Sequence, residues 1–391
     1  MPEIFYGGAE TQFRILLDRI NTQRFDVTVF VEQSHKNSDR TAGQQWMARQ
    51  TELQFVLCRG LSRDRRLLSA SRLSRILIPY LRRRQFDAIL VYSAIGLRVT
   101  PITRLFGVFT LYSERNEASY SALTRIRKRI YFASANVIVC NSSVAQQNYE
   151  SYGYRAALIE NAVLPPARPR SVRSHQTTGI TVLVPGRIAP VKNQELVVRA
   201  LPELGKSVKR ILFAGVIEDT DYFQKLEDSI ARLSCAASVE FLGFVKDMDE
   251  LYESSDLVVL PSRSEGTPNV VLEALVREIP CLAGDIPTNR SVLRNELLFS
   301  VDDPNSFAAA VERLTRLSAI EVHNLVASLR EYVAERFSER NMVDSYERLC
   351  ATRGSLSADR YATPIERRTG AKTSQPDANR TVISRVFRSR R

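Results

Sequence analysis

Short runs of apolar residues alternate with longer stretches of helical periodicity along most of the chain. Five runs in the first part predict strands, at residues 26–31, 53–57, 87–91, 108–112 and 136–140. Five more predict strands in the second part, at residues 180–184, 210–214, 239–242, 256–260 and 280–283. Apolar runs that are separated by helices are typical of βαβ units, in which helices cover both faces of a parallel sheet. The fold is therefore predicted to be α/β, with two doubly wound, Rossmann-like domains.

Changes in composition predict where these domains end. Residues 162–179 are rich in Pro, Arg, Ser and Thr, which ends regular structure and marks a linker. We expect a first domain at residues 1–161, a second at 180–337 and a last helix at 338–352. Residues 353–391 are polar and basic, so they are expected to be a disordered tail.

The formal net charge of the chain is +12, and the basic residues gather in two places. The predicted tail holds ten Lys or Arg against three acids, and residues 59–84 hold nine Arg against one acid. Apolar residues recur at helical spacing in that second block: Leu73, Ile76, Leu77, Tyr80 and Leu81. Such a helix either lies against anionic lipid headgroups or covers a sheet with its basic side in water. No stacking aromatic or recognition helix accompanies the arginines, so nucleic acid is not an expected partner.

The cysteines and the hydropathy pattern suggest a cytoplasmic protein with reduced thiols. Five cysteines lie far apart with no Cys-x-x-Cys pair, which indicates neither a disulfide framework nor a zinc site. No apolar run approaches the ~20 residues that a membrane-spanning helix needs. Any membrane contact is therefore expected to be peripheral, at the inner face.

One stretch of the second half carries the strongest candidate chemistry. Residues 256–260 predict a buried strand and residues 261–266 a turn, and Pro268 is expected to begin a helix that Thr267 caps. Glu265 then lies at the end of the strand, and Glu273 about two turns into the helix. Ligands of open parallel sheets bind at this edge, where helix amino termini attract anions. Two carboxylates here suit a ligand that carries both hydroxyls and phosphate.

The sequence around this pair resembles glycosyltransferase family 4, whose members are retaining enzymes that take a sugar from a nucleotide-diphosphate sugar. Residues 184–194 resemble the phosphate loop of that family, residues 239–245 its nucleotide-contacting strand, and residues 279–283 the strand after the glutamate helix. Gly7-Gly8-Ala9-Glu10 resembles the glycine loop of the acceptor-side domain. The resemblance implies the GT-B architecture, in which two Rossmann-like domains face a cleft and a late helix returns to the first domain.

The resemblance also implies roles for individual residues. Breaking a sugar–diphosphate bond builds negative charge on the leaving phosphate, and Arg187 and Lys192 are predicted to stabilise it. Glu265 would hold hydroxyls of the sugar and Glu273 those of the ribose, with no covalent attack assigned to either. The remaining predicted donor contacts are Gly266, Thr267, Asn269, Val270, Phe244 and Val245. Gly7 and Gly8 are predicted to form the acceptor-side phosphate loop.

No metal and no cofactor is expected. Two Asp-x-Asp triplets begin at Asp219 and Asp247, but each precedes a predicted helix, where Asp is favoured as a cap. The first domain lacks the histidine that many family members place near the acceptor, so no catalytic histidine is predicted. Glu114, Arg115 and Asn116 are candidates either for acceptor contacts or for a helix entry.

The start of the chain departs from the expected fold. A glycine loop in a doubly wound domain follows a first strand, but only six residues precede Gly7. We therefore expect the first strand of this sheet to be missing and unpaired edge groups to be exposed.

These observations together predict a retaining, metal-independent transferase that moves sugar to a glycan or lipid-linked oligosaccharide in surface polysaccharide biosynthesis. UDP is the expected nucleotide because it is frequent in the family. The alternative is a catalytically silent relative that acts as a binding or scaffolding subunit. A nucleic-acid-binding protein remains a third hypothesis, which rests on charge alone.

Overall fold

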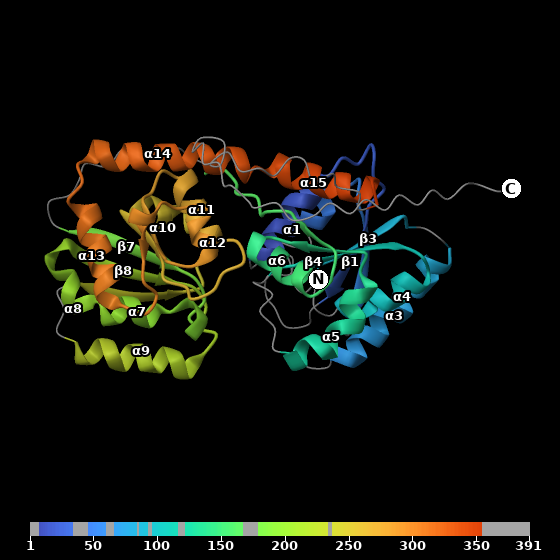
Figure 1. Ribbon diagram of the computed structural model, residues 1–391, viewed down its shortest axis with the longest axis horizontal. Coiled ribbons are helices and arrows are strands. Elements are labelled where there is room, and N and C mark those ends of the chain that lie inside the picture. The colour runs from blue at the N-terminus through green and yellow to red at the C-terminus, as the bar shows by residue number, and fades with distance from the viewer. Residues whose placement is uncertain are drawn as a thin grey trace, which may run out of the picture. The chain divides into compact units, whose positions relative to one another are not determined.

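The computed structural model describes residues 8–33, 46–59, 66–83, 86–92, 96–115, 122–166, 179–233 and 237–353. Residues 1–354 form one compact unit. Two α/β halves make up this unit, and each contains parallel strands with helices against them (Figure 1). We call residues 8–166 the amino-terminal half and residues 179–336 the carboxyl-terminal half. The predicted α/β fold with two Rossmann-like domains is confirmed, whereas the residue limits drawn for the domains stay predictions.

The carboxyl-terminal half is built on a six-stranded parallel sheet in the order β12-β11-β10-β7-β8-β9. Its strands are β7 (Ile180–Pro185), β8 (Val208–Ala214), β9 (Ser238–Gly243), β10 (Leu257–Leu260), β11 (Cys281–Gly284) and β12 (Leu298–Phe299). Its helices are α7 (Gln194–Arg199), α8 (Leu201–Leu204), α9 (Thr220–Arg232), α10 (Met248–Ser254), α11 (Asn269–Val276), α12 (Pro287–Arg290), α13 (Pro304–Thr315) and α14 (Ala319–Arg336). After β7 the chain adds β8 and β9 on one side of this strand, and then β10, β11 and β12 on its other side. The order therefore reverses between β7 and β10.

The apolar runs of the sequence form the core of this sheet. All four residues of β10 are buried, and so are those of β11. Phe213 stacks on Phe241 of the neighbouring strand, with ring centroids 5.0 Å apart. Because helices cover both faces of the sheet, strands that are apolar at every position are stable here.

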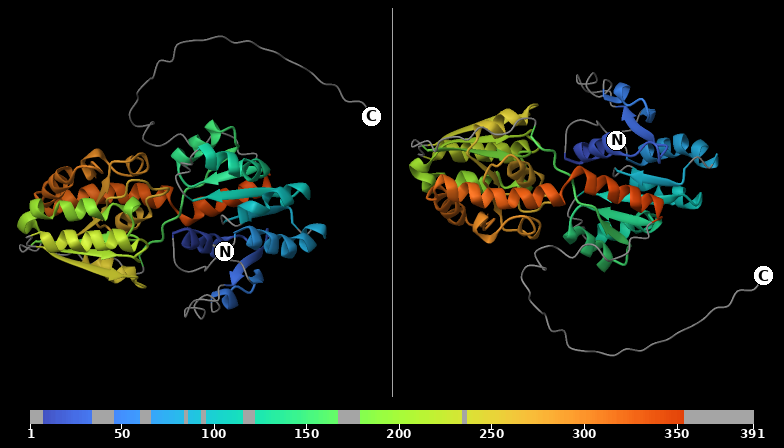
Figure 2. Two further views of the ribbon diagram at one scale, coloured as in Figure 1. Left: turned by 90° about the horizontal axis from the view of Figure 1, so that it is seen from below. Right: turned by 90° about the horizontal axis from the view of Figure 1, so that it is seen from above.

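The amino-terminal half contains a four-stranded parallel sheet in the order β3-β4-β5-β6 and a separate parallel pair, β1 and β2. Its strands are β1 (Thr28–Gln33), β2 (Gln54–Arg59), β3 (Ala88–Val91), β4 (Phe109–Glu114), β5 (Val137–Cys140) and β6 (Ala156–Leu158). Its helices are α1 (Gly8–Arg19), α3 (Arg66–Arg82), α4 (Thr100–Leu105), α5 (Ala122–Ser134) and α6 (Ser143–Ser151). The last described helix, α15 (Glu339–Ala351), lies along α1 (Figure 2). Met342 and Tyr346 of α15 share a buried cluster with Leu16 of α1.

Helix α3 carries the apolar residues of the basic block. Its Leu77 and Leu81 are 4% and 2% exposed and pack with Val99 and Val108. Leu77 and Leu81 therefore belong to the core, as expected for a helix that covers a sheet, whereas Leu73, Ile76 and Tyr80 are partly exposed.

Most predicted strands lie within two residues of the observed ones. Two short strands, β6 and β12, were not predicted, and α11 begins at Asn269, one residue later than expected. Thr267 does not cap this helix, because its hydroxyl donates to the carbonyl of Asn141 at 2.8 Å. This turn is thus held by a residue of the other half.

Candidate active site

Two of the three predicted catalytic residues, Lys192 and Glu265, meet where the strand order of the second sheet reverses. Lys192 follows β7 and Glu265 follows β10, and these two strands are neighbours. The Lys192 Nζ donates to Glu265 Oε1 at 2.6 Å, and the two side chains are 19% and 13% exposed. Such a reversal point is where open α/β sheets bind ligands. The pair is therefore a partly buried ion pair at the expected ligand edge.

The backbone fixes this pair. Lys192 ends a short 3-10 helix, and Asn193 then takes the left-handed conformation, with φ at 57°. The Asn193 side chain donates to the carbonyls of Pro261 at 3.1 Å and Val301 at 2.9 Å. The loop after β7 is thereby fastened to the loop after β10, which carries Glu265.

Three glycines let the neighbouring loops approach closely. Gly186 has φ at 145°, which favours glycine, and it lies beside the Lys192 side chain. A Cβ on Gly215 would lie 2.0 Å from the Gly186 carbonyl oxygen, so no other residue fits there. The Gly215 N–H donates to the carbonyl of Gly243 at 2.8 Å. The carboxyl ends of β7, β8 and β9 thus form one continuous edge next to the ion pair.

The third predicted catalytic residue, Arg187, and the predicted donor contact Phe244 are more exposed. Arg187 forms an ion pair with Glu218, and both side chains are about half exposed. Phe244, directly after β9, is 50% exposed, whereas Val245 packs partly against the core. Arg187 and Phe244 therefore keep surface that a ligand can cover.

Glu273 is held by a tyrosine that the sequence analysis missed. The Tyr252 hydroxyl donates to Glu273 Oε2 at 2.7 Å, and the Arg277 guanidinium lies over the Tyr252 ring at 4.8 Å. Burial raises the pKa of the Glu273 carboxyl, and the hydrogen bond from Tyr252 only partly offsets this. Burial, together with the carboxylate beside it, raises the pKa of Tyr252. Glu273 is thus a partly buried, oriented acceptor.

The turn after Glu265 touches the amino-terminal half. A Cβ on Gly266 would lie 2.9 Å from the Arg115 carbonyl oxygen and 2.9 Å from Asn141 Nδ2. The Asn141 side-chain oxygen is buried and has no hydrogen-bond partner among the described residues. Position 266 therefore needs glycine, because two chain segments approach closely there. The Asn141 side-chain oxygen remains as a hydrogen-bond acceptor at this contact.

Asn269 makes the next contacts with the amino-terminal half. Asn161 donates to Asn269 Oδ1 at 3.0 Å, and a Cβ on Gly8 would lie 2.8 Å from Asn269 Nδ2. We call the segment between β10 and the first residue of α11, Asn269, the donor-side turn. The amino terminus of α1, predicted as the acceptor-side loop, thus lies against this donor-side turn. Val270 follows in α11 and packs partly against the core. Gly7 lies outside the described residues.

Two of the candidate acceptor residues turn out to be structural. Glu114 is 2% exposed, and it accepts from the Tyr149 hydroxyl at 2.8 Å. The Arg115 guanidinium donates to Asn161 at 2.5 Å and to the Tyr346 hydroxyl at 2.7 Å. Their side chains serve the packing of the first sheet and α15, so an acceptor contact through Glu114 is wrong. Asn116 lies outside the described residues.

The two Asp-x-Asp triplets also have structural roles. Asp219 caps α9 by accepting from the Tyr222 N–H, and Asp247 caps α10 by accepting from the Asp249 N–H. Within the described part of the chain, no three His, Cys, Asp or Glu side chains are grouped so that they could hold a metal ion. Independence from metal stays a prediction.

Two family models match the chain. The one described as Glycosyltransferase Family 4 matches residues 6–164, and the one described as Glycosyl transferases group 1 matches residues 168–336. The chain belongs to glycosyltransferase family 4. The solved structures agree with this fold: Anabaena HepE in complex with UDP and glucose superposes with a TM-score of 0.73 at 17% identity, over 90% of this chain and 98% of HepE.

Curated glycosyltransferases are similar to this chain over shorter stretches. The uncharacterized glycosyltransferase MJ1607 of Methanocaldococcus jannaschii is 29% identical over 167 residues, which are 41% of this chain and 42% of that protein. The UDP-Gal:alpha-D-GlcNAc-diphosphoundecaprenol alpha-1,3-galactosyltransferase of Escherichia coli is 36% identical over 77 residues, 19% of this chain and 20% of that protein. The chain therefore spans less than half the length of these two relatives.

Proposed function

We propose that this family 4 member transfers a sugar from a nucleotide-diphosphate sugar, with retention of configuration and without a metal ion. The observation that carries the proposal is the Lys192–Glu265 ion pair, partly buried at the point where the strand order reverses. A cation and an acid side by side suit a donor that has an anionic phosphate next to a sugar. The amino terminus of α11 adds favourable backbone dipoles on the same edge.

The chemistry follows from the charges. Departure of the diphosphate leaves positive charge at the anomeric carbon and adds negative charge to the phosphate. Lys192 stabilises the phosphate from within the protein, and Arg187 reaches it from the solvent side once it leaves Glu218. Glu265 binds sugar hydroxyls and stabilises the positive carbon without attacking it. The acceptor hydroxyl then adds from the face that the phosphate leaves, and the phosphate takes up its proton.

UDP is the nucleotide we propose. HepE has been crystallised with UDP and with UDP-glucose, and the name of the Escherichia coli relative specifies UDP-Gal. In this chain, Phe244 offers a half-exposed ring on which a base can stack, and Glu273 offers an oriented carboxylate for ribose hydroxyls. Burial of Glu273 strengthens such hydrogen bonds because water competes less.

The acceptor we propose is a glycan or lipid-linked oligosaccharide at the inner face of an anionic membrane. No helix of the described part is both long and apolar enough to span a bilayer. Helix α5 nevertheless exposes Ile126 and Ile130, at 70% and 62%, one turn apart on the same side. Arg127 and Arg129 beside them are exposed, and the helix has no acidic residue. This surface suits peripheral contact with anionic headgroups.

Sedimentation with vesicles tests the membrane contact. Wild-type protein is expected to bind phosphatidylglycerol vesicles more strongly than phosphatidylcholine vesicles, and the double substitution Ile126→Ser with Ile130→Ser is expected to weaken binding. Ile320→Ser is the matched control, because Ile320 of α14 is similarly exposed, at 63%. Equal loss in both variants would rule out α5 as the contact.

A panel of UDP-, GDP- and ADP-sugars tests the activity itself. Release of nucleoside diphosphate is expected from one nucleotide class, and Glu265→Gln and Lys192→Ala are expected to reduce it by roughly 10²-fold or more. Arg210→Ala, which breaks an exposed ion pair with Glu240, is the control that should keep full activity. Binding of a donor without turnover would favour a silent scaffolding subunit. Failure to bind any donor would overturn both.

A further inference from the structure

Asn161 follows the last strand of the amino-terminal half, and its side chain reaches the other half. The residue is 3% exposed. Its Nδ2 donates to Asn269 Oδ1 at 3.0 Å, and its Oδ1 accepts from Arg115 at 2.5 Å. Asn269 comes directly after the donor-side turn, which carries Glu265, and it begins α11, which carries Glu273 one turn further on. One buried amide therefore joins the amino-terminal half to the segment that carries both predicted donor carboxylates.

The orientation of this amide is fixed by its partners. A guanidinium group only donates hydrogen bonds, so the oxygen of the Asn161 amide faces Arg115 and its nitrogen faces Asn269. Asn269 must then present its oxygen, which leaves its Nδ2 on the side of Gly8. Neither amide can be reversed while Arg115 keeps its place. The contact is therefore directional as well as close.

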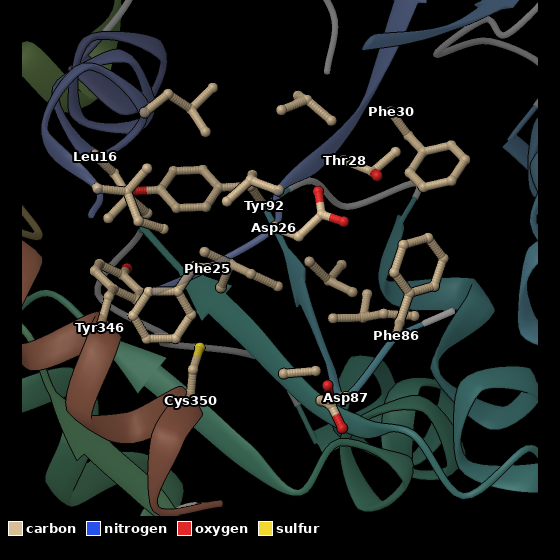
Figure 3. A pocket seen from close by; sticks show the side chains of 18 of the residues that line it. Leu16, Phe25, Asp26, Thr28, Phe30, Phe86, Asp87, Tyr92, Tyr346 and Cys350 are labelled. Atoms are coloured by element: carbon tan, nitrogen blue, oxygen red, sulfur yellow. The ribbon is translucent and has the colours of Figure 1, made fainter. Parts of the chain in front are cut away.

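Arg115 is held by two tyrosines. Its guanidinium lies over the Tyr92 ring at 4.4 Å and donates to the Tyr346 hydroxyl at 2.7 Å. Both tyrosines line the cavity shown in Figure 3, where Tyr346 comes from α15. Tyr92 and Tyr346 are themselves buried, at 9% and 2% exposed. Arg115 is therefore a firm base for the Asn161 amide.

The backbone that follows Asn161 is fastened as well. The Ala162 N–H donates to Gln12 Oε1 at 2.7 Å, and Gln12 Nε2 donates back to the Ala162 carbonyl at 2.8 Å. The Val163 N–H donates to the carbonyl of Phe337, between α14 and α15, at 2.9 Å. Asn161 is thus fixed through its own side chain and through the next two residues. A side chain that is held this firmly can determine where its partner lies.

We propose that Asn161 is a positioning residue for the sugar transfer. It holds the first residue of α11, and through that helix start it sets the places of Glu265 and Glu273. Thr267 is held from the same half, because its hydroxyl donates to the Asn141 carbonyl at 2.8 Å. The donor-side turn and the helix after it are thus fastened at two points. The inference rests on the proposed function, because Asn161 acts through residues that are predicted to bind the donor.

Loss of this contact is expected to lower kcat more than donor affinity. A displacement of about 1 Å between reacting groups can lower a rate about 10²-fold. UDP keeps its predicted contacts with Lys192 and Phe244 when α11 shifts, so its binding depends less on Asn161. The KM for the donor is therefore expected to stay within about threefold of the wild-type value while kcat falls.

Two carboxylate substitutions test the contact between the side chains. Asn161→Asp keeps the bond from Arg115, and the Asn269 amide can then turn to donate to the new carboxylate. In Asn269→Asp, Asn161 donates as before. Each single variant is expected to keep kcat within about fivefold of wild type, the effect of one ordinary hydrogen bond. The double variant has no N–H between the two side chains, so its kcat is expected to fall about 10²-fold at neutral pH.

Acid is expected to restore the contact in the double variant. Two adjacent carboxylates repel each other, which raises the pKa of the pair above the ordinary range of aspartate, and one shared proton supplies an O–H donor. The ratio of the kcat of the double variant to that of wild type should therefore rise several-fold between about pH 8 and about pH 6. A defect in folding alone would not recover in acid.

Glu160→Gln is the matched control for stability. Glu160 directly precedes Asn161, and its carboxylate accepts from Arg336 at 2.6 and 2.7 Å. This variant is expected to unfold at lower urea concentration and to keep the kcat of wild type. If the double variant does not fold, Asn161→Ala removes the contact without adding charge, and it is expected to lower kcat about tenfold.

The outcomes separate this inference from the proposed function. An inactive wild-type protein would overturn the proposed function and this inference with it. An active wild type would overturn the inference alone if Asn161→Ala and the folded double variant both kept its kcat. Equal losses of kcat in Glu160→Gln and Asn161→Ala would have the same effect, because Asn161 would then act on stability only.

Discussion

Replacing Lys192 with alanine is expected to destabilise the fold by about 1–2 kcal/mol, although the residue lies at the surface edge of a sheet. Its Nζ lies 2.6 Å from Glu265 Oε1, and the two side chains are 19% and 13% exposed. Breaking a fully buried pair costs about 3–5 kcal/mol, because it leaves an unpaired buried charge. An exposed pair contributes about 0–1 kcal/mol. The Lys192–Glu265 pair lies between these limits, and the residual exposure admits water that lowers the cost.

Urea unfolding measures this cost in free energy. Two further variants show how much of it comes from the buried ion pair. Arg210→Ala breaks a pair whose side chains are 47% and 40% exposed, and it is expected to cost at most about 0.5 kcal/mol. Lys192→Ala combined with Glu265→Gln removes the unpaired charge, so stability is expected to return in part. The coupling energy between the two substitutions is expected to be about 1–2 kcal/mol. Sugar transfer should stay low in the double variant, because the phosphate still lacks its cation.

Two results would show that the Lys192–Glu265 pair does not have this role. If Lys192→Ala costs no more than Arg210→Ala, the pair is not effectively buried and its placement at the ligand edge is wrong. If the double variant regains activity together with stability, Lys192 acts only on folding. Either result would remove the electrostatic basis of the proposed function.

Three further changes have defined outcomes. Glu273→Gln is expected to stabilise the fold at neutral pH, because burial raises the pKa of Glu273 and the charged carboxylate then opposes folding. The gain in the free energy of unfolding should shrink as the pH falls towards the ordinary pKa of glutamate. Unfolding curves at several pH values will measure this. The same variant should bind UDP more weakly, and a stability gain without that loss would argue against the ribose contact. Gly215→Ala is expected to cost about 3 kcal/mol or more, since the new Cβ would lie 2.0 Å from the Gly186 carbonyl oxygen, and unchanged thermal stability would contradict this. Phe244→Ala should raise the KM for the donor about tenfold with little change in kcat, as expected for a ring that stacks on the base.

The fold of this chain could be predicted well because several of its strands, such as β10 and β11, carry apolar side chains throughout. Residues such as 257–260 are buried on both faces, so hydrophobicity alone marks them. The two strands that were missed, β6 and β12, are three and two residues long, too short to produce a pattern. The late start of α11 could not be foreseen, because Thr267 is held by Asn141, a residue far away in the sequence.

The candidate site was predictable only as far as local sequence fixes it. Lys192 and Glu265 follow strands that are neighbours in the sheet, so their meeting followed from the motif order once the fold was known. Tyr252 and Asn141 were missed because their contacts depend on how α10 packs and on how β5 ends beside the donor-side turn. Gly215 had a weak signal, a glycine directly after a predicted strand, but its close approach to the next loop needed the structure.

The central claim is that the donor binds at the edge where β7 and β10 end, and a hydrogen-exchange footprint of UDP tests it most directly. UDP is expected to slow amide exchange in residues 186–192, 243–245 and 264–273, and to leave residues 28–33 and 88–91 unchanged. The footprint should disappear in Lys192→Ala and persist in Arg210→Ala. A footprint that lies elsewhere, or one that survives the loss of Lys192 intact, would contradict the account.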